Sequence, residues 1–316
     1  MNTGYYTDPI FLRHDTGDHP EHASRLRAIS QAVQAAGLPS RLRLHGAEPA
    51  TEEDLKLIHS VEYIRRVEEA ALSGQAYLGT PDCLLSEDTF SVAKHAAGTL
   101  KHAVTEVAEG RLDNAFVACR PPGHHAEQSQ ALGFCFFNNV AIGAEFLVRE
   151  LGYERVLIFD FDVHHGNGTQ HAFESRKDVF YASMHQHPRT CYPGTGYLEE
   201  KGTGDGLGYT LNMPMLPYAT DDDYLRILES QVLPAFRDYR PQFILLSAGF
   251  DGHQDDPLAL VNLTQHGFDT ILRRMQQLAH EMCGGKLVSV LEGGYHLQRL
   301  SECVTSHLQI LHTSPE

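Results

Sequence analysis

The sequence contains no long apolar run and carries little positive charge. None of its apolar runs approaches the 18 residues that a membrane-spanning helix needs, and its first eight residues lack a basic region followed by an apolar one. The formal net charge of −16 argues against sequence-independent binding of nucleic acid, because a negative surface repels the phosphates. We therefore expect a cytoplasmic protein without a membrane anchor or a nucleic-acid partner, and one that attracts cationic molecules.

The sequence also lacks a closely spaced cysteine pair. Its six cysteines are scattered along the chain: Cys83, Cys119, Cys135, Cys191, Cys283 and Cys303. This spacing indicates neither a zinc ribbon nor a disulfide framework, and it favours a reducing compartment. The 316 residues are 42% hydrophobic and 21% charged, which excludes a largely disordered chain. Because α/β folds of this length are often one unit, we expect a single domain over residues 1–316, without predicting its oligomeric state.

Apolar runs alternate with amphipathic segments from residue 113 onward. We expect strands at 115–119, 155–162, 179–185, 209–215, 243–250 and 286–291, with helices at 138–151, 221–239, 264–283 and 297–312. Before them, we expect a short first strand and helices near 26–36, 51, 60–67 and 86–109. Strands separated by helices imply a mainly parallel, doubly wound sheet. The carboxyl ends of its strands then lie along one edge of the sheet, where sites form.

Residues 155–162 lead from an apolar run into carboxylates and imidazoles. Residues 156–159 are continuously apolar, as expected of a strand that is covered on both faces. Because alternate side chains of a strand share a face, we expect Asp160, Asp162 and His164 to point the same way. Buried carboxylates repel each other strongly unless they share a cation or a proton. This stretch therefore predicts a metal site at the end of the strand.

A third ligand comes from Asp251, which follows the strand that begins at residue 243. A catalytic zinc keeps three protein ligands and one open position, and Asp162, His164 and Asp251 satisfy that count. The same ligand types suit iron(II) or manganese(II). The residues alone therefore leave the identity of the metal open.

The other polar groups at the strand ends are typical of a hydrolase. His124 and His125 follow a rigid Pro-Pro-Gly turn and are candidates for general base and acid. Tyr295 is a candidate donor to a carbonyl oxygen that becomes negative in the transition state. Asp160 and Asn167 are natural hydrogen-bond partners of the imidazoles. Each residue alone has an ordinary explanation, such as a loop histidine or a core aromatic, so the interpretation depends on their joint placement.

Several motifs occur in an order and spacing that resemble the histone deacetylase family over residues 19–296. They are the pair His124-His125, Gly133-Phe134-Cys135-x-x-Asn138, Asp160-x-Asp162-x-His164-His165-Gly166-x-Gly168-Thr169-Gln170, Ser247-Ala248-Gly249-Phe250-Asp251 and Glu292-Gly293-Gly294-Tyr295. The Arg120-Pro121-Pro122-Gly123 turn, and Asn167 in place of an acid, are similar to the class II branch and its bacterial histone deacetylase-like amidohydrolases. The resemblance implies an arginase-like three-layer α/β fold, whose central, mainly parallel sheet is flanked by helices. It also implies a zinc-dependent amidohydrolase that removes acyl groups from lysine side chains of proteins or peptides.

The resemblance also implies roles for individual residues. By the family pattern, Asp162, His164 and Asp251 bind zinc, with iron(II) as the alternative. His125 is the principal base with Asn167 as its partner, while Asp160 supports His124, and Tyr295 matches the tyrosine that stabilises the transition state. A structural potassium or sodium site maps onto the backbone of Asp160, Asp162, His164 and Met184 and the hydroxyl of Ser183.

The substrate channel is implied in the same way. Phe134 and Tyr192 line it, and their flat rings suit the aliphatic stem of an acyl-lysine. Gly133 offers a backbone acceptor to the substrate amide, and Asp82 aligns with an aspartate at the rim that holds the substrate backbone in some members. Polyamine-selective relatives carry an acidic gatekeeper at the position of Leu258. An apolar residue there weakens a polyamine interpretation, although acylated polyamines and other small acyl amides remain the alternative substrates.

Two further alternatives belong to other functional classes. A ureohydrolase with two manganese ions shares the expected fold, but it needs more carboxylates than the segment from Asp251 to His253 offers. A protein that binds acyl-lysine without hydrolysing it is disfavoured, because every catalytic group of the family pattern is present.

Overall fold

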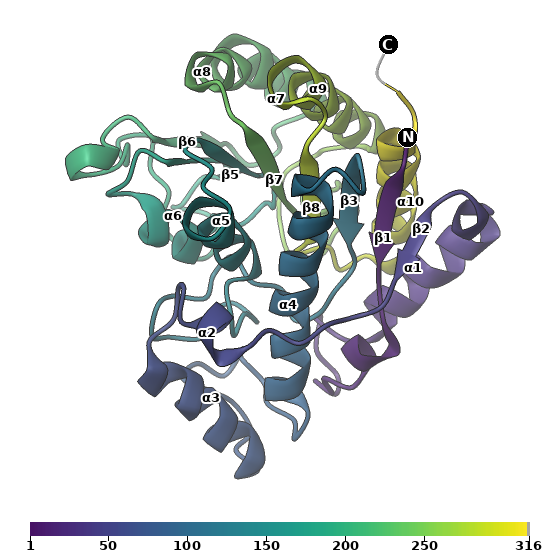
Figure 1. The fold of residues 1–316 in the computed structure, drawn as a ribbon, viewed down its shortest axis with the longest axis vertical. Coiled ribbons are helices and arrows are strands. Elements are labelled where there is room, and N and C mark those ends of the chain that lie inside the picture. Colours follow the sequence, from purple (N-terminus) through teal and green to yellow (C-terminus); the bar gives the residue numbers. More distant parts are fainter. Residues whose placement is uncertain (315–316) are drawn as a thin grey trace.

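The computed structural model describes residues 1–314 and centres on one eight-stranded sheet (Figure 1). The order of the strands is β2-β1-β3-β8-β7-β4-β5-β6, and all of the pairs are parallel. The strands are β1 (Thr3–Tyr6), β2 (Arg43–His45), β3 (Asn114–Val117), β4 (Val156–Asp160), β5 (Val179–Gln186), β6 (Thr210–Met215), β7 (Phe243–Ala248) and β8 (Leu287–Leu291). The predicted parallel α/β fold is confirmed.

Helices cover both faces of the sheet and complete three layers (Figure 1). The helices are α1 (Ser24–Ala35), α2 (Glu52–Leu55), α3 (Val61–Leu72), α4 (Thr89–Ala108), α5 (Asn139–Arg149), α6 (Asn167–Phe173), α7 (Asp221–Ile227), α8 (Leu233–Tyr239), α9 (Gln265–Cys283) and α10 (Leu297–His312). Helices α4 and α5 pack on one face of the sheet, and α9 and α10 pack on the other. Within residues 1–314, no helix is long and apolar enough to cross a membrane.

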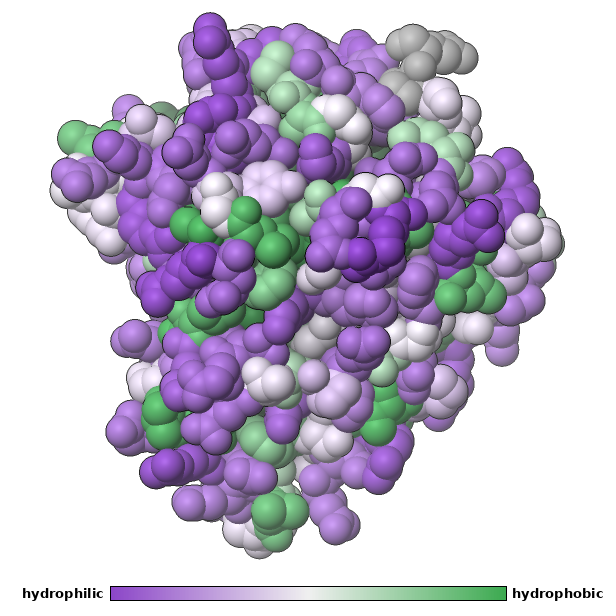
Figure 2. All heavy atoms as spheres, in the orientation of Figure 1, coloured by the Kyte–Doolittle hydropathy of each residue, from purple (hydrophilic) through white to green (hydrophobic). Residues whose placement is uncertain are grey.

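The sequence explains where most of these elements lie. The apolar strands β4, β7 and β8 are buried along their whole length, as expected of strands covered on both faces. Thr51 and Ser60 cap α2 and α3, because their side chains accept hydrogen bonds from backbone N–H groups of the first turn. Hydrophilic side chains cover most of the face drawn in Figure 2, and apolar ones gather near its middle.

Several details differ from the expected elements. Strands β3, β4 and β7 each end two residues before their predicted ends, and α6 begins at Asn167, where no helix was predicted. A π-helical segment, Leu228–Val232, interrupts the helix expected at 221–239. Strand β2 was not predicted, because its three residues are partly exposed and show no apolar run. None of these differences changes which strands end beside the predicted site.

Neighbouring strands end close together at the carboxyl edge of the sheet. Ser247 of β7 pairs with Asp160 of β4 on one side and with Val290 of β8 on the other. Val117 of β3 also pairs with Val290. The segments that follow these four strands therefore start side by side, and they carry the motifs that the sequence singled out.

We predict that Gly98→Ala destabilises the fold where α4 meets the segment before α2. A Cβ at this position would lie 2.2 Å from the backbone nitrogen of Ala50, which is too close for either chain to accommodate without moving. The expected cost is about 1–3 kcal/mol in the free energy of unfolding, measured by urea denaturation.

Gly143→Ala in α5 is the matched control. The nearest atom to its added Cβ is Leu100 Cδ2 at 3.4 Å, an ordinary contact. This variant should be neutral or more stable by up to about 1 kcal/mol, because alanine favours a helix. Equal free energies of unfolding for the two variants would contradict the packing argument.

Candidate active site

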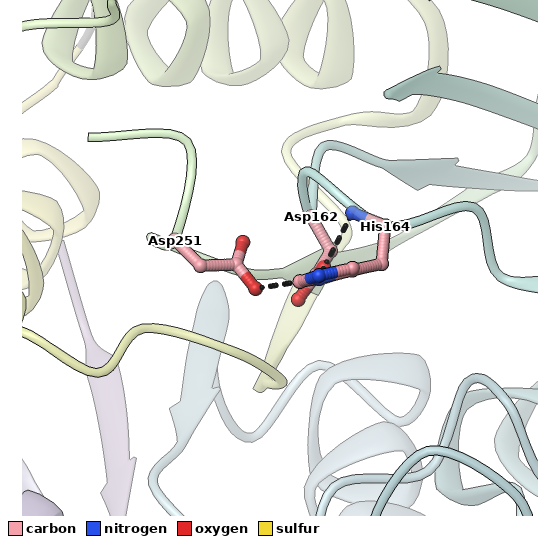
Figure 3. A group of neighbouring side chains, drawn as sticks. All are labelled: Asp162, His164 and Asp251. Atoms are coloured by element: carbon pink, nitrogen blue, oxygen red, sulfur yellow. Dashed lines mark hydrogen bonds and ion pairs between the residues drawn. The ribbon is translucent and has the colours of Figure 1, made fainter. Parts of the chain in front are cut away.

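Three ligand-type side chains meet beyond the ends of β4 and β7 (Figure 3). Asp162 and His164 follow β4, Asp251 follows β7, and one ligand atom from each lies within 4.8 Å of the others. His164 Nδ1 is 3.1 Å from Asp162 Oδ1 and 3.0 Å from Asp251 Oδ2. Both carboxylates are buried, and 12% of the His164 side chain is exposed. The structure thus brings together the three residues predicted to bind a metal.

The charges of this triad explain why it suits a cation. Burial, and then the charge of Asp162, raises the pKa of Asp251 to about 7. Burial also acts against the ionised form of Asp162, but His124 and His164 outweigh it and lower the pKa of that carboxyl. Two carboxylates this deep repel each other, and a divalent cation between them offsets the repulsion. Two oxygens and one imidazole nitrogen are also a donor set that zinc and iron(II) accept, so the residues fit such an ion.

Glycines make room for the two carboxylates. A Cβ on Gly249 would lie 2.1 Å from Asp162 Oδ2, and one on Gly293 would lie 2.0 Å from Asp251 Oδ2. The backbone N–H of Gly293 donates to Asp162 Oδ2 at 2.7 Å, and that of Val163 donates to Asp251 Oδ1 at 2.9 Å. These glycines therefore position the ligands, a role that the sequence pattern did not reveal.

The adjacent histidines lie beside this triad, and each is held by a different element. The Nδ1 of His124 donates to Asp160 Oδ2 at 3.0 Å, and that of His125 donates to Asn167 Oδ1 at 2.8 Å. The two rings are 4.0 Å apart between centroids, and both side chains are buried. Both predicted pairings are present, with Asp160 and Asn167 behind the histidines.

The expectation that Asp160, Asp162 and His164 share one strand face is wrong. Because β4 ends at Asp160, the alternation of a strand does not extend to the two residues beyond it. The backbone N–H of Asp162 instead donates to Asp160 Oδ1 at 3.1 Å in a tight turn. Asp160 consequently contacts the Nδ1 of His124, whereas Asp162 lies between His164 and the Nε2 of His124, which is 3.9 Å from Asp162 Oδ1.

The surroundings of the two histidines differ in charge. Burial disfavours the charged form of His124, but Asp160 and Asp162 outweigh it and raise its pKa to about 10. Burial, together with the neighbouring His124 and His164, lowers the pKa of His125 well below its usual value. One imidazole of the pair thus favours the charged form and the other the neutral form.

A narrow cleft of about 260 Å³ opens above the triad. The five residues predicted to bind substrate all line this cleft: Asp82, Gly133, Phe134, Tyr192 and Leu258. The rest of the lining consists of Pro122, His124, His125, His164, Gly293 and Tyr295. A Cβ on Gly133, which has a φ of +53°, would lie 2.3 Å from His125 Cδ2 and 3.0 Å from Tyr192 Cε1. Only glycine lets the chain approach the His125 ring this closely.

Tyr295 is held at the wall of the cleft by charged and aromatic neighbours. Its ring centroid lies 5.0 Å from the guanidinium carbon of Arg25 and 5.9 Å from the ring centroid of Phe134. Its backbone N–H donates to Asp256 Oδ2 at 2.6 Å. Burial raises the pKa of the Tyr295 hydroxyl well above its usual value, so the group stays protonated and able to donate.

A buried ion network supports the loops around the cleft. Glu21 Oε1 lies 3.1 Å from Arg25 Nη1 and 2.6 Å from Arg120 Nε. Burial disfavours the ionised form of Glu21, but Arg120 and Arg25 outweigh it and lower its pKa to about 2. Arg25 also donates to the carbonyl oxygens of Glu292 and Gly294, at 2.5 Å and 2.7 Å. No role was predicted for Glu21 or Arg25, although His19-Pro20-Glu21 lies at the start of the segment that resembles the family.

Glu292 and Asp256 are two further supports that the sequence analysis missed. Glu292 Oε2 accepts from the backbone N–H groups of Gly123 and His124, at 2.7 Å and 3.2 Å, and so fixes the turn before the histidines. Burial raises the pKa of Glu292 to about 7. Its place in the Glu-Gly-Gly-Tyr motif was visible in the sequence, but its contact with the distant histidine turn was not.

The residues predicted to hold a monovalent cation lie behind the site. Ser183 and Met184 belong to β5, and Ser183 pairs with Asp160 of β4. The Ser183 hydroxyl is 2.8 Å from His185 Nδ1. Their role in binding a cation stays a prediction.

A larger cavity, of about 1040 Å³, lies at the opposite edge of the sheet. Arg155 and Asp178, which directly precede β4 and β5, are part of its lining, as are the rings of Tyr153, Tyr209 and Tyr239. The residues described as lining it include none of the predicted site residues. Size alone therefore does not locate the site, whereas the convergence of titratable groups does.

Comparisons with known proteins agree with this geometry. The profile of the family described as "Histone deacetylase domain" matches residues 19–311. The chain is 38% identical to a "Probable deacetylase" of Archaeoglobus fulgidus over 301 residues, which cover 94% of this chain and 82% of the relative. It is also 38% identical to the "Histone deacetylase-like amidohydrolase" of Pseudomonas aeruginosa over 278 residues, which cover 88% of this chain and 72% of the relative.

Two plant comparisons add structural support. "Histone deacetylase 15" of Arabidopsis thaliana is 38% identical over 296 residues, which cover 93% of this chain but only 52% of that protein. The crystal structure of the HDA15 HD domain has a TM-score of 0.92 at 37% identity, covering 100% of this chain and 90% of that chain. The family profile and the relatives agree over nearly the whole length, and the chain belongs to the histone deacetylase family of deacetylases and amidohydrolases.

Proposed function

We propose that the protein is a zinc-dependent amidohydrolase that removes acetyl and other acyl groups from lysine side chains of proteins or peptides. The observation that carries this proposal is the convergence of the Asp162, His164 and Asp251 triad, the paired histidines and Tyr295 at one narrow cleft. We place the activity in a single cytoplasmic domain over residues 1–316. The state of the six cysteines, all of which are free thiols, supports a reducing compartment.

The cleft suits a long aliphatic side chain that ends in an amide. Phe134, Tyr192 and Leu258 line it and offer apolar contact to the lysine stem. The Gly133 carbonyl accepts from the Cys135 thiol at 3.2 Å and keeps a second lone pair for the substrate N–H. Asp82 Oδ2 accepts a hydrogen bond from the Gly133 N–H at 3.2 Å, which holds the carboxylate at the rim of the cleft. There it can also accept a hydrogen bond from a backbone N–H of the substrate.

Asp162, His164 and Asp251 would hold zinc, or iron(II) as the alternative, and the bound ion would supply a Lewis acid for the acyl carbonyl and for the attacking water. The His125 Nδ1–H is engaged by Asn167, so its Nε2 is the atom that takes a proton from the attacking water. Tyr295 donates a hydrogen bond to the carbonyl oxygen as that oxygen becomes negative. The protonated imidazoles then supply the proton that the leaving amine needs. In this proposal a potassium or sodium ion near Asp160 and Ser183 is structural.

An acylated polyamine is the second candidate substrate, because the net charge of −16 favours a cationic molecule. Leu258 argues against it, since an apolar side chain lines the cleft where a carboxylate would hold a second amine. A ureohydrolase with two manganese ions is less consistent with the site. His253 does not join the triad, and its Nδ1 accepts from the backbone N–H of Asp255 at 3.1 Å.

We predict that the purified enzyme cleaves an acetyl-lysine peptide with a higher kcat/KM than acetylputrescine. A chelator should abolish both activities, and added zinc should restore them. A panel of acyl lengths on one peptide, assayed with each metal, identifies the preferred group. A kcat/KM for acetylputrescine that equals or exceeds the kcat/KM for the peptide would indicate that acylated polyamines are the substrates. Tight binding of acyl-lysine peptides without hydrolysis of any of them would indicate a binding protein instead.

We predict that Tyr295→Phe lowers kcat by about 10²–10³-fold, because it removes one hydrogen bond that forms to the developing oxyanion. Zinc content, measured by elemental analysis, should stay the same since no metal ligand is lost. Tyr209→Phe is the matched control, because Tyr209 lines the cavity at the opposite edge of the sheet. If Tyr295→Phe hydrolysed substrate at the wild-type rate, Tyr295 would have no role in the reaction.

We predict that Asp162→Ala abolishes tight metal binding and hydrolysis together. The change removes one of three ligands and the carboxylate that holds the His164 backbone N–H at 2.9 Å. Elemental analysis after dialysis should find zinc in the wild-type protein and in the exposed control Asp222→Ala, but not in Asp162→Ala. A variant that keeps stoichiometric zinc would show that the triad is not the metal site.

A further inference from the structure

The Asn167 side chain lies between a hydrogen-bond donor, His125, and a hydrogen-bond acceptor, Glu127. Its Oδ1 accepts from His125 Nδ1 at 2.8 Å. Its Nδ2 donates to Glu127 Oε1 at 2.5 Å and to the carbonyl oxygen of His125 at 3.3 Å. The amide therefore links the buried histidine to a carboxylate that the family motifs described above do not include.

Glu127 is fixed on both its backbone and its side chain. Its N–H donates to the Gln130 carbonyl at 2.9 Å, and its carbonyl oxygen is 3.0 Å from His59 Nδ1. Its Oε1 also accepts from His171 Nδ1 at 2.9 Å, and His171 lies one turn after Asn167 on α6. The carboxylate is thus shared between two residues of the same helix face.

His171 is the second hydrogen-bond donor to the Glu127 carboxylate. Its hydrogen bond to Glu127 raises the pKa of His171, burial opposes the shift, and the nearby Glu174 and Glu200 add to it. The side chain of His171 is 46% exposed and that of Glu127 is 21% exposed. Both line a polar cavity of about 510 Å³ that also includes Glu145, Arg149 and Arg176, so the pair is reached from solvent away from the substrate cleft.

The hydrogen-bond chemistry of an amide makes its orientation decisive. A carboxylate only accepts hydrogen bonds, so Glu127 must face the NH₂ group of Asn167. The amide oxygen then faces His125, and Nδ1 of that imidazole must carry the proton. Its Nε2 is left with a free lone pair on the side of the cleft. If the amide turned over, its NH₂ group would face Nδ1 and the neutral imidazole would carry its proton on Nε2.

We propose that Glu127 is a positioning residue for hydrolysis: its carboxylate sets the orientation of the Asn167 amide and, through it, the tautomer in which His125 Nε2 accepts a proton. The inference rests on the proposed function, because it assumes that His125 is the base. Glu127 is not among the residues described as lining the cleft or forming the triad of candidate metal ligands, and its Oε1 lies 2.5 Å from Asn167 Nδ2.

The first test is a double-mutant cycle on Glu127 and Asn167. Glu127→Gln should lower kcat about tenfold with KM unchanged, because a glutamine amide presents either its oxygen or its NH₂ group and no longer fixes Asn167. Asn167→Asp should lower kcat further, since two carboxylates would then face each other across a hydrogen-bond distance. The double variant should be at least about tenfold more active than Asn167→Asp, because a glutamine NH₂ group can donate to the new carboxylate.

The sign of the Glu127→Gln effect is the decisive outcome of the cycle. The substitution should be harmful in the wild-type background and beneficial in the Asn167→Asp background. The same fold-change in both backgrounds would overturn the proposal. Glu174→Gln is the matched control, because it removes a charge near His171 without touching Asn167, and it should leave kcat unchanged. Zinc content and the urea midpoint of each variant establish that the compared proteins are folded and loaded.

The second test reads the tautomer directly and does not depend on turnover. In protein labelled with ¹⁵N-histidine, two-bond nitrogen–proton correlations distinguish a protonated Nδ1 from a protonated Nε2, and His125→Asn identifies the signals. We expect His125 protonated at Nδ1 in the wild-type protein, and a mixture of tautomers in Glu127→Gln, with and without zinc. An unchanged tautomer in Glu127→Gln would overturn the inference even if the enzyme is active. A wild-type protein that hydrolyses no acyl amide would instead overturn the proposed function.

Discussion

The repulsion between Asp162 and Asp251 is the constraint on which the rest of the site depends. Two buried carboxylates that follow neighbouring strands are unfavourable unless charge, hydrogen bonds and space are all supplied around them. His164 lies between them, the backbone N–H groups of Val163 and Gly293 donate to them, and glycines leave room for their oxygens. In the proposed function a divalent cation would complete this arrangement, and the order of the parallel strands explains why the three candidate ligands come from separate parts of the chain.

A second charged cluster connects the surrounding loops. Arg120 precedes the histidine turn, and Arg25 holds the carbonyl groups on either side of Gly293. Both arginines share the carboxylate of Glu21, so the wall that carries Tyr295 and the wall that carries His124 are attached to one buried anion. Removing one partner would leave an uncompensated charge in the interior, which typically costs several kcal/mol. The ion network that holds these two walls in position therefore also stabilises the carboxyl edge of the sheet.

The sequence predicted those parts of the structure that depend on local pattern. The apolar strands and the polar residues at the strand ends were predicted correctly, because burial on both faces of a strand leaves a clear apolar pattern. The short strand β2 and the early end of β4 were not, since they depend on pairing with distant residues. The same limit applies to Glu127, Glu292 and Asp256. Their partners are set by packing between segments that are distant in the sequence, and even the motif that contains Glu292 does not reveal its contact with the histidine turn.

The two histidines take their partners from elements that differ in their depth within the fold. Asp160 ends a central buried strand and lies two residues from a metal ligand, whereas Asn167 stands at the start of α6, a short helix whose later residues reach the surface. A sequence change that shifts Asp160 also disturbs Asp162, whereas a change on the outer face of α6 acts on His125 through Asn167. Under the proposed function, substitutions on α6 would therefore adjust proton transfer without loss of metal affinity. Proteins with the same ligand triad would then be free to differ in catalytic rate through residues that no substrate touches.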